Sequence, residues 1–97
     1  MKTPLEKRIE KKLCEEVKKL GGLSIKLVPT FFTGLPDRMV MLPEGVIFFV
    51  ETKRMNQKPT ARQSFVHIQF HNLGFKVFVI ETEDQIYGTL YASQLPK

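Results

Sequence analysis

Residues 34–53 read GLPDRMVMLPEGVIFFVETK, and this stretch decides the fold. Two apolar runs flank the triplet Pro43–Gly45, in which proline presets the first bend and glycine suits the closing position. Residues 38–42 and 46–53 are therefore predicted to pair as an antiparallel hairpin. The second run is apolar on both faces over residues 46–50, which is typical of a central strand.

The register of this hairpin brings two acids together. With Leu42 opposite Val46, stepping outward along the two strands places Asp37 opposite Glu51. Opposed carboxylates repel by up to roughly 1 kcal/mol unless a positive group lies between them. Lys53 lies on the same face as Glu51, one pleat further on. This arrangement favours a cation site, and ligation by oxygen alone favours Mg²⁺ or Mn²⁺ over zinc. The alternative is an ordinary surface ion pair at a strand end.

The remaining periodicities predict an α/β domain. Thr3 caps a helix in which Leu5 begins a series of apolar residues at intervals of three or four, and Gly21-Gly22 ends it. Thr60 caps a second helix that runs to Leu73 and has an apolar side. The other expected elements are a strand over 23–28, a loop over 29–36, a polar loop over 54–59, a strand over 75–80 and a short helix beginning at 82. The order is helix, three strands, helix, strand, helix, which implies one domain over residues 1–97 with a mixed sheet and a crossover helix.

Composition narrows the function classes. Lys and Arg number 15 against 10 Asp and Glu, and the formal net charge of +5 favours a polyanion such as nucleic acid as partner. Cys14 is the single cysteine, which excludes an internal disulfide and a multi-cysteine zinc site. No apolar run approaches the length of a membrane span, and the charged N-terminal residues do not form a signal peptide. We therefore expect a protein of the cytoplasm, or of the host cytoplasm if a phage encodes it, with no membrane partner.

These motifs together resemble a known nuclease family. Pro36-Asp37 followed by Glu51-x-Lys53 is similar to the signature of the PD-(D/E)xK superfamily, and the further pattern of Gly34, Gln63 and Gly74 resembles its virus-type replication-repair nuclease (VRR-NUC) domain. The resemblance spans nearly the whole chain. It implies a restriction-endonuclease-like core: a helix, a three-strand antiparallel meander, a crossover helix and a fourth strand. One departure is that residues 55–58 lack the glycine often found after the lysine.

The resemblance also assigns roles. It implies that Asp37, Glu51 and the backbone carbonyl of Thr52 bind Mg²⁺ or Mn²⁺, and that Lys53 positions or activates water. No organic cofactor is expected.

Two further residues each have two interpretations. The family pattern on the first helix fits Glu6 as a further metal ligand, with Glu10 as the reserve, although Glu6 also forms a capping box with Thr3. Gln63 either orients the active-site water or lysine, or closes a capping box with Thr60.

Basic and aromatic residues outside this set are candidates for contacts with DNA or a second subunit. The cluster of Arg54, Lys58 and Arg62 is expected to bind phosphates beside the cut site, or else to be a solvated loop and helix start. The same alternatives apply to four residues of the first helix, Lys7, Arg8, Lys11 and Lys12. Phe31 and Phe32 either pack in the core, stack on a base, wedge a junction or seal a subunit contact. His67 and His71 stand one helical turn apart, as a metal pair would, but the pattern supplies no third ligand, so they are interpreted as surface or interface histidines.

The function hypothesis is a dimeric Holliday-junction resolvase. A two-fold dimer suits a branched, nearly two-fold DNA, and connections this short favour recognition of shape over sequence. The first alternative is a nuclease of the same fold that cuts flaps, nicks or duplex DNA. The second is a non-catalytic nucleic-acid-binding module with structural acids.

Overall fold

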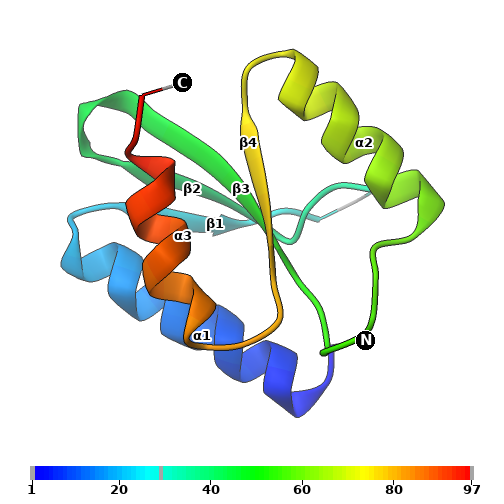
Figure 1. Cartoon of the computed structure of the whole chain (residues 1–97), viewed down its shortest axis with the longest axis horizontal. Coiled ribbons are helices and arrows are strands. Elements are labelled where there is room, and N and C mark those ends of the chain that lie inside the picture. The colour runs from blue at the N-terminus through cyan, green and yellow to red at the C-terminus, as the bar shows by residue number, and fades with distance from the viewer. Residues whose placement is uncertain (1, 29, 97) are drawn as a thin grey trace.

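The computed structural model describes residues 2–28 and 30–96, so Pro29, the first residue of the expected loop, lies outside the described residues. Its elements follow the predicted order (Figure 1). They are α1 (Pro4–Lys19), β1 (Leu23–Lys26), β2 (Arg38–Leu42), a 3₁₀ turn (Pro43–Gly45), β3 (Val46–Thr52), α2 (Ala61–Asn72), β4 (Lys76–Ile80) and α3 (Gln85–Ser93).

The four strands form one mixed sheet in the order β1-β2-β3-β4. β1, β2 and β3 are antiparallel neighbours, and β4 joins β3 in parallel after the crossover through α2. The predicted hairpin is confirmed with its register, from Leu42 opposite Val46 to Arg38 opposite Val50. Its turn closes through Gly45 at φ 77°, a left-handed conformation that glycine adopts without steric cost.

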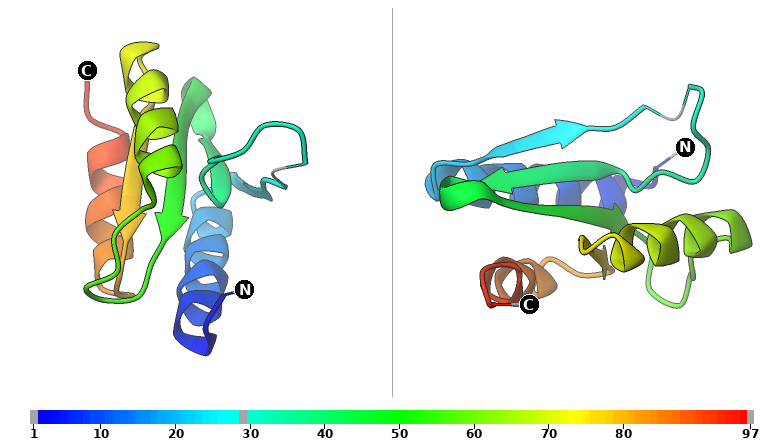
Figure 2. Two further views of the ribbon diagram at one scale, coloured as in Figure 1. Left: turned by 90° about the vertical axis from the view of Figure 1, so that its right-hand side faces the viewer. Right: turned by 90° about the horizontal axis from the view of Figure 1, so that it is seen from above.

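Two helices cover one face of this sheet and enclose the core. α1 and α3 touch each other, and both touch β3 (Figures 1 and 2). The buried cluster takes side chains from these helices and from the face of the strands that they cover: Ile9, Leu13, Val17, Val40, Leu42, Phe48, Val50, Ile80, Ile86 and Leu90. Glycine lets the chain turn tightly from α1 into β1, because a Cβ at Gly22 would lie 2.4 Å from the carbonyl oxygen of Met41.

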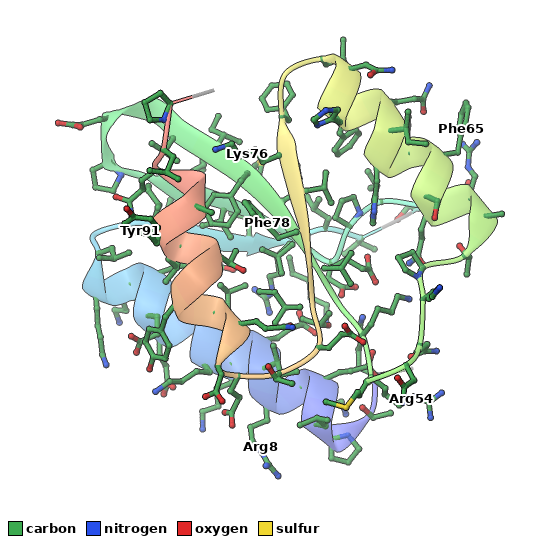
Figure 3. All side chains as sticks on the ribbon, in the orientation of Figure 1. Arg8, Arg54, Phe65, Lys76, Phe78 and Tyr91 are labelled. Atoms are coloured by element: carbon green, nitrogen blue, oxygen red, sulfur yellow. The ribbon has the colours of Figure 1, made fainter. Side chains whose placement is uncertain are left out.

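The opposite face is only partly covered. α2 packs beside β4, and its Phe70 approaches Phe49 of β3 with ring centroids 4.7 Å apart. In the right-hand view of Figure 2, β1 and β2 lie in front of α1 with no helix over them. The predicted apolar side of α2 is therefore buried at Val66 but largely exposed at Phe65, which points away from the sheet (Figure 3).

Several element ends differ from the prediction. β1 ends at Lys26 and β4 begins at Lys76, each inside the expected range. α3 begins at Gln85 rather than at residue 82, because the Gln85 side chain accepts hydrogen bonds from the backbone N–H groups of Glu81 and Thr82 and holds them in a turn. Among the described residues, no helix has both the length and the apolar character needed to cross a membrane.

Candidate functional site

A polar pocket of about 460 Å³ opens where β2 begins, β3 ends and the first turns of α1 and α2 approach the sheet. It brings together residues far apart in sequence. Its lining consists of Lys2, Thr3, Glu6, Asp37, Glu51, Lys53, Arg54, Gln57 and Gln63. The pocket therefore holds the predicted catalytic side chains Glu6, Asp37, Glu51, Lys53 and Gln63, together with Arg54 of the predicted basic cluster.

Asp37 is held by the residue that follows Glu51. Its Oδ2 atom accepts hydrogen bonds from the backbone N–H of Thr52 at 2.8 Å and from the Thr52 hydroxyl at 2.9 Å. The paired strands bring these groups together because Asp37 comes directly before β2 and Thr52 ends β3. The carboxylate is thereby fixed at the end of the hairpin, as the predicted register requires.

Lys2 places its ammonium group among the acids. Its Nζ atom donates to Asp37 Oδ2 at 2.5 Å and to the backbone carbonyl of Thr52 at 2.8 Å. The same atom lies 3.5 Å from Glu51 Oε2 and 3.6 Å from Glu6 Oε2. Burial lowers the pKa of Lys2, but Asp37 and the two glutamates outweigh this effect and raise it overall. Sequence reasoning missed this residue, because Lys2 precedes the helix and belongs to no periodic pattern.

The carboxylate of Glu51 is buried close to a second acid, an environment that disfavours its charged form. Its side chain is 1% exposed, and its Oε1 atom has no hydrogen-bond partner among the described residues. Burial raises the pKa of this carboxyl and repulsion from Asp37 raises it further, while Lys2 and Lys53 partly oppose both effects. Lys53 Nζ lies 3.4 Å from Glu51 Oε2. Taken together, these effects raise the pKa of Glu51 above its ordinary value.

The capping-box interpretation of Gln63 is confirmed, and its amide also contacts Glu51. Its Oε1 accepts from the backbone N–H of Thr60 and closes the predicted capping box, while its Nε2 donates to Glu51 Oε2 at 3.3 Å. The cap fixes the amide at the start of α2, and the amide in turn orients the Glu51 carboxylate. Gln57, which also lines the pocket, was not predicted because nothing in a polar loop marks one residue over its neighbours.

The two glutamates of α1 have different surroundings. Glu6 lines the pocket and also forms the predicted capping box, in which its Oε1 accepts from the backbone N–H of Thr3 at 3.0 Å. Burial raises the pKa of Glu6, but the hydrogen bonds from Thr3 and the charges of the nearby lysines lower it overall. Glu10, the reserve candidate, instead pairs with Arg38 at 2.9 Å from Nε to Oε1. Glu6 is therefore the α1 carboxylate that faces the acids of the hairpin.

The predicted basic cluster is divided. Arg54 lines the pocket, but Lys58 and Arg62 do not. Arg62 donates to Thr33 Oγ1 at 3.1 Å, and its guanidinium carbon lies 6.0 Å from the Phe32 ring centroid and 5.8 Å from that of Phe65. These contacts tie the start of α2 to the loop before β2.

The remaining candidates lie outside the pocket. Phe31 is fully exposed and Phe32 about half exposed, so Phe31 is not a core residue. Lys7, Arg8 and Lys11 are exposed on α1, and Arg8 projects away from the sheet (Figure 3). The Nε2 atom of His67 is buried without a hydrogen-bond partner among the described residues, and burial together with the Lys53 charge lowers the pKa of this histidine.

The donor set fits a hard divalent cation. Oxygens of Glu6, Asp37, Glu51 and Thr52 all face the position of one ammonium group, and Glu51 Oε1 has a free acceptor position. Over residues 2–28 and 30–96, no group of three or more His, Cys, Asp or Glu side chains is arranged to hold a metal ion. A metal here would also use the Thr52 carbonyl and water, as Mg²⁺ commonly does in proteins.

Comparisons with known proteins agree with the motif resemblance. No family model matches the chain. Over 79 residues the chain is 44% identical to "Putative nuclease p44" of Acyrthosiphon pisum secondary endosymbiont phage 1, which covers 81% of this chain and 85% of that protein. A solved structure described as a VRR_NUC domain superposes with a TM-score of 0.85 at 38% identity, covering 92% of this chain and 97% of that one.

Proposed function

The chain belongs to the VRR_NUC domain family, and from this premise we propose that it is a metal-dependent, structure-selective DNA endonuclease that resolves four-way junctions as a homodimer. Family membership supports the coarser statement, a nuclease. The phage origin of the relative supports action in the cytoplasm of an infected host cell.

One observation carries the proposal. Three carboxylates and one backbone carbonyl from α1, β3 and the residue before β2 face a single cation position, with Lys53 beside it. Glu51 and Glu6 are 1% and 5% exposed. Burying such charges lowers the stability of the fold unless they are paired or bind an ion. Buried acids gathered around a cation are what hydrolysis of a phosphodiester by a metal-activated water requires.

The roles of the chain's residues follow from their positions. Asp37, Glu51, Glu6 and the Thr52 carbonyl would hold Mg²⁺ or Mn²⁺, which when bound lowers the pKa of water and offsets charge on the phosphate. Lys53 extends its ammonium group into the pocket beside Glu51, where it can donate to a phosphate oxygen or to the attacking water. Gln63 keeps the Glu51 carboxylate in one orientation, and Thr52 does the same for Asp37.

DNA binding is assigned to basic residues at and near the pocket. Arg54 lies at the pocket itself, and Lys58 follows it in the same exposed loop. These side chains would bind phosphates and add affinity that falls with salt. The packing of Arg62 between Phe32 and Phe65 supports a role in shaping this surface rather than in direct phosphate contact.

The uncovered face of the sheet supports a homodimer. Leu23 is 62% exposed, and Ile25 and Ile47 are about 40% exposed. They share this face, because Leu23 pairs with Met41 and Met41 pairs with Ile47. On α2, Phe65 and Ile68 are also more than half exposed. Exposed apolar area of this kind commonly marks a subunit contact, and a two-fold contact would present two pockets to one junction.

Cleavage of a labelled four-way junction with Mn²⁺ tests the proposal. Wild type should produce symmetric paired nicks, and the rate of Lys53→Ala should fall by about 10²-fold or more, the usual cost of losing a group that stabilises transition-state charge. Lys18→Met removes an exposed charge at the far end of α1 and should cut as wild type does.

The same assay distinguishes the proposed function from the competing ones. Faster cutting of flaps, nicks or plain duplex than of junctions would replace the resolvase with another nuclease of this fold. If no DNA is cut, or if Lys53→Ala cuts as fast as wild type, the proposed active site is wrong.

A further inference from the structure

Lys2 occupies the position at which the candidate metal ligands converge. Its Nζ atom contacts Asp37 Oδ2 and the Thr52 carbonyl at 2.5 and 2.8 Å, and lies within 3.6 Å of both glutamates. An ion bound by these four oxygens at the usual 2.0–2.1 Å or so would take the space of the ammonium group. Lys2 and such an ion cannot be present together.

We propose that Lys2 is a built-in competitor for the divalent cation: its ammonium group closes the site in the metal-free protein and is displaced when the metal binds. This inference rests on the proposed function, since it concerns the same site. Lys2 precedes the cap of α1 at Thr3, so its displacement breaks no helical or strand hydrogen bond.

The charges of the cluster favour the exchange. Three carboxylates face the two ammonium groups of Lys2 and Lys53, which leaves one negative charge uncompensated when all five groups are ionised. Replacing the single charge of Lys2 by a divalent ion makes the cluster neutral. Glu51 Oε2, which lies 3.5 Å from Lys2 Nζ, would bind the ion in place of the ammonium group.

The competition has two consequences. In the absence of metal, Lys2 keeps the acids from repelling one another, so the pocket is preformed. When the metal binds, displacing Lys2 costs part of the binding free energy. The measured metal affinity is therefore lower than that of the same site without Lys2 in it. The N-terminal residues should also become more mobile when the metal binds.

Titration calorimetry with Mn²⁺ and no DNA tests the inference. Lys2→Met keeps most of the side-chain stem and removes the charge, and we expect it to bind Mn²⁺ at least about tenfold more tightly than wild type, the factor that corresponds to about 1.4 kcal/mol. Lys18→Met should leave the affinity unchanged. Lys53→Met removes a charge that lies beside one acid without occupying the shared position, and should give a clearly smaller gain than Lys2→Met.

A second measurement follows Lys2 directly. Addition of Mg²⁺ to ¹⁵N-labelled wild type should increase the mobility of the Lys2 amide in relaxation experiments, while the centre of α1 is unaffected. Equal Mn²⁺ affinities of wild type and Lys2→Met, or equal gains from Lys2→Met and Lys53→Met, would overturn the inference and leave the nuclease proposal intact. If none of the proteins binds Mn²⁺, both proposals are wrong.

Discussion

Replacing Glu51 by glutamine should stabilise the metal-free protein. Glu51→Gln keeps the size of the side chain but removes a charge that is 1% exposed, lies near Asp37 and has one oxygen without a partner among the described residues. A buried polar group without a partner costs about 1–3 kcal/mol and a charged one costs more, so the glutamine amide removes only the additional cost of the charge. Lys2 and Lys53, at 3.5 and 3.4 Å, recover part of that cost. We expect a net gain of about 1 kcal/mol, or roughly 4–8 °C in Tm for a domain of this size.

The gain should depend on pH. Because the pKa of Glu51 is raised above its ordinary value of 4.5, the folded protein binds this proton more tightly than the unfolded chain does. The stability that this proton contributes is fully present at pH values below the pKa of Glu51 in the unfolded chain. It is lost as pH rises through the pKa of Glu51 in the folded protein. The difference in favour of Glu51→Gln should therefore be small in acid and grow as pH rises above 4.5.

Thermal and urea unfolding in EDTA, at pH 4 and pH 7.5, would measure this difference. Glu15→Gln is the matched control, because it removes an exposed carboxylate from α1 and should change Tm little. A Glu51→Gln protein that is less stable than wild type at pH 7.5 would refute the reasoning. It would mean that the two lysines more than offset the burial of Glu51, as in an ordinary structural ion pair.

Three other perturbations follow from the packing. Arg38→Met leaves Glu10 buried without its partner and should cost about 3 kcal/mol in urea unfolding, whereas the double variant with Glu10→Gln should recover much of that loss. Gly22→Ala forces a Cβ to within 2.4 Å of the Met41 carbonyl and should lower Tm strongly, whereas Gly88→Ala has open space in α3 and should add about 0.5–1 kcal/mol. Ile25→Asp on the uncovered sheet face should convert a dimer into a monomer in light scattering, with its Tm measured to verify folding, and an unchanged mass would exclude this face as the contact.

Much of the site could be derived from the sequence because local rules act on it. The turn at residues 43–45 and the two-residue period of a strand are sufficient to place Asp37 opposite Glu51, and the backbone pairing agrees. Thr3 with Glu6, and Thr60 with Gln63, form capping boxes whose spacing is visible in the sequence. In each case the interacting groups are close in sequence or are related by one hairpin.

Tertiary structure alone decided which other side chains join the hairpin acids at the pocket. Glu6, in the first turn of α1, lines the pocket with the hairpin acids, whereas Glu10, one turn further along, pairs with Arg38. Lys2 reaches Asp37 and Thr52 across 35 and 50 residues of sequence, a contact that no periodicity encodes. The sequence by itself determined the strand pairing and the acids at its end, since these depend on neighbouring residues. The position of the cation that the acids surround depends on how a helix start docks against a strand end, and only the folded chain decides it.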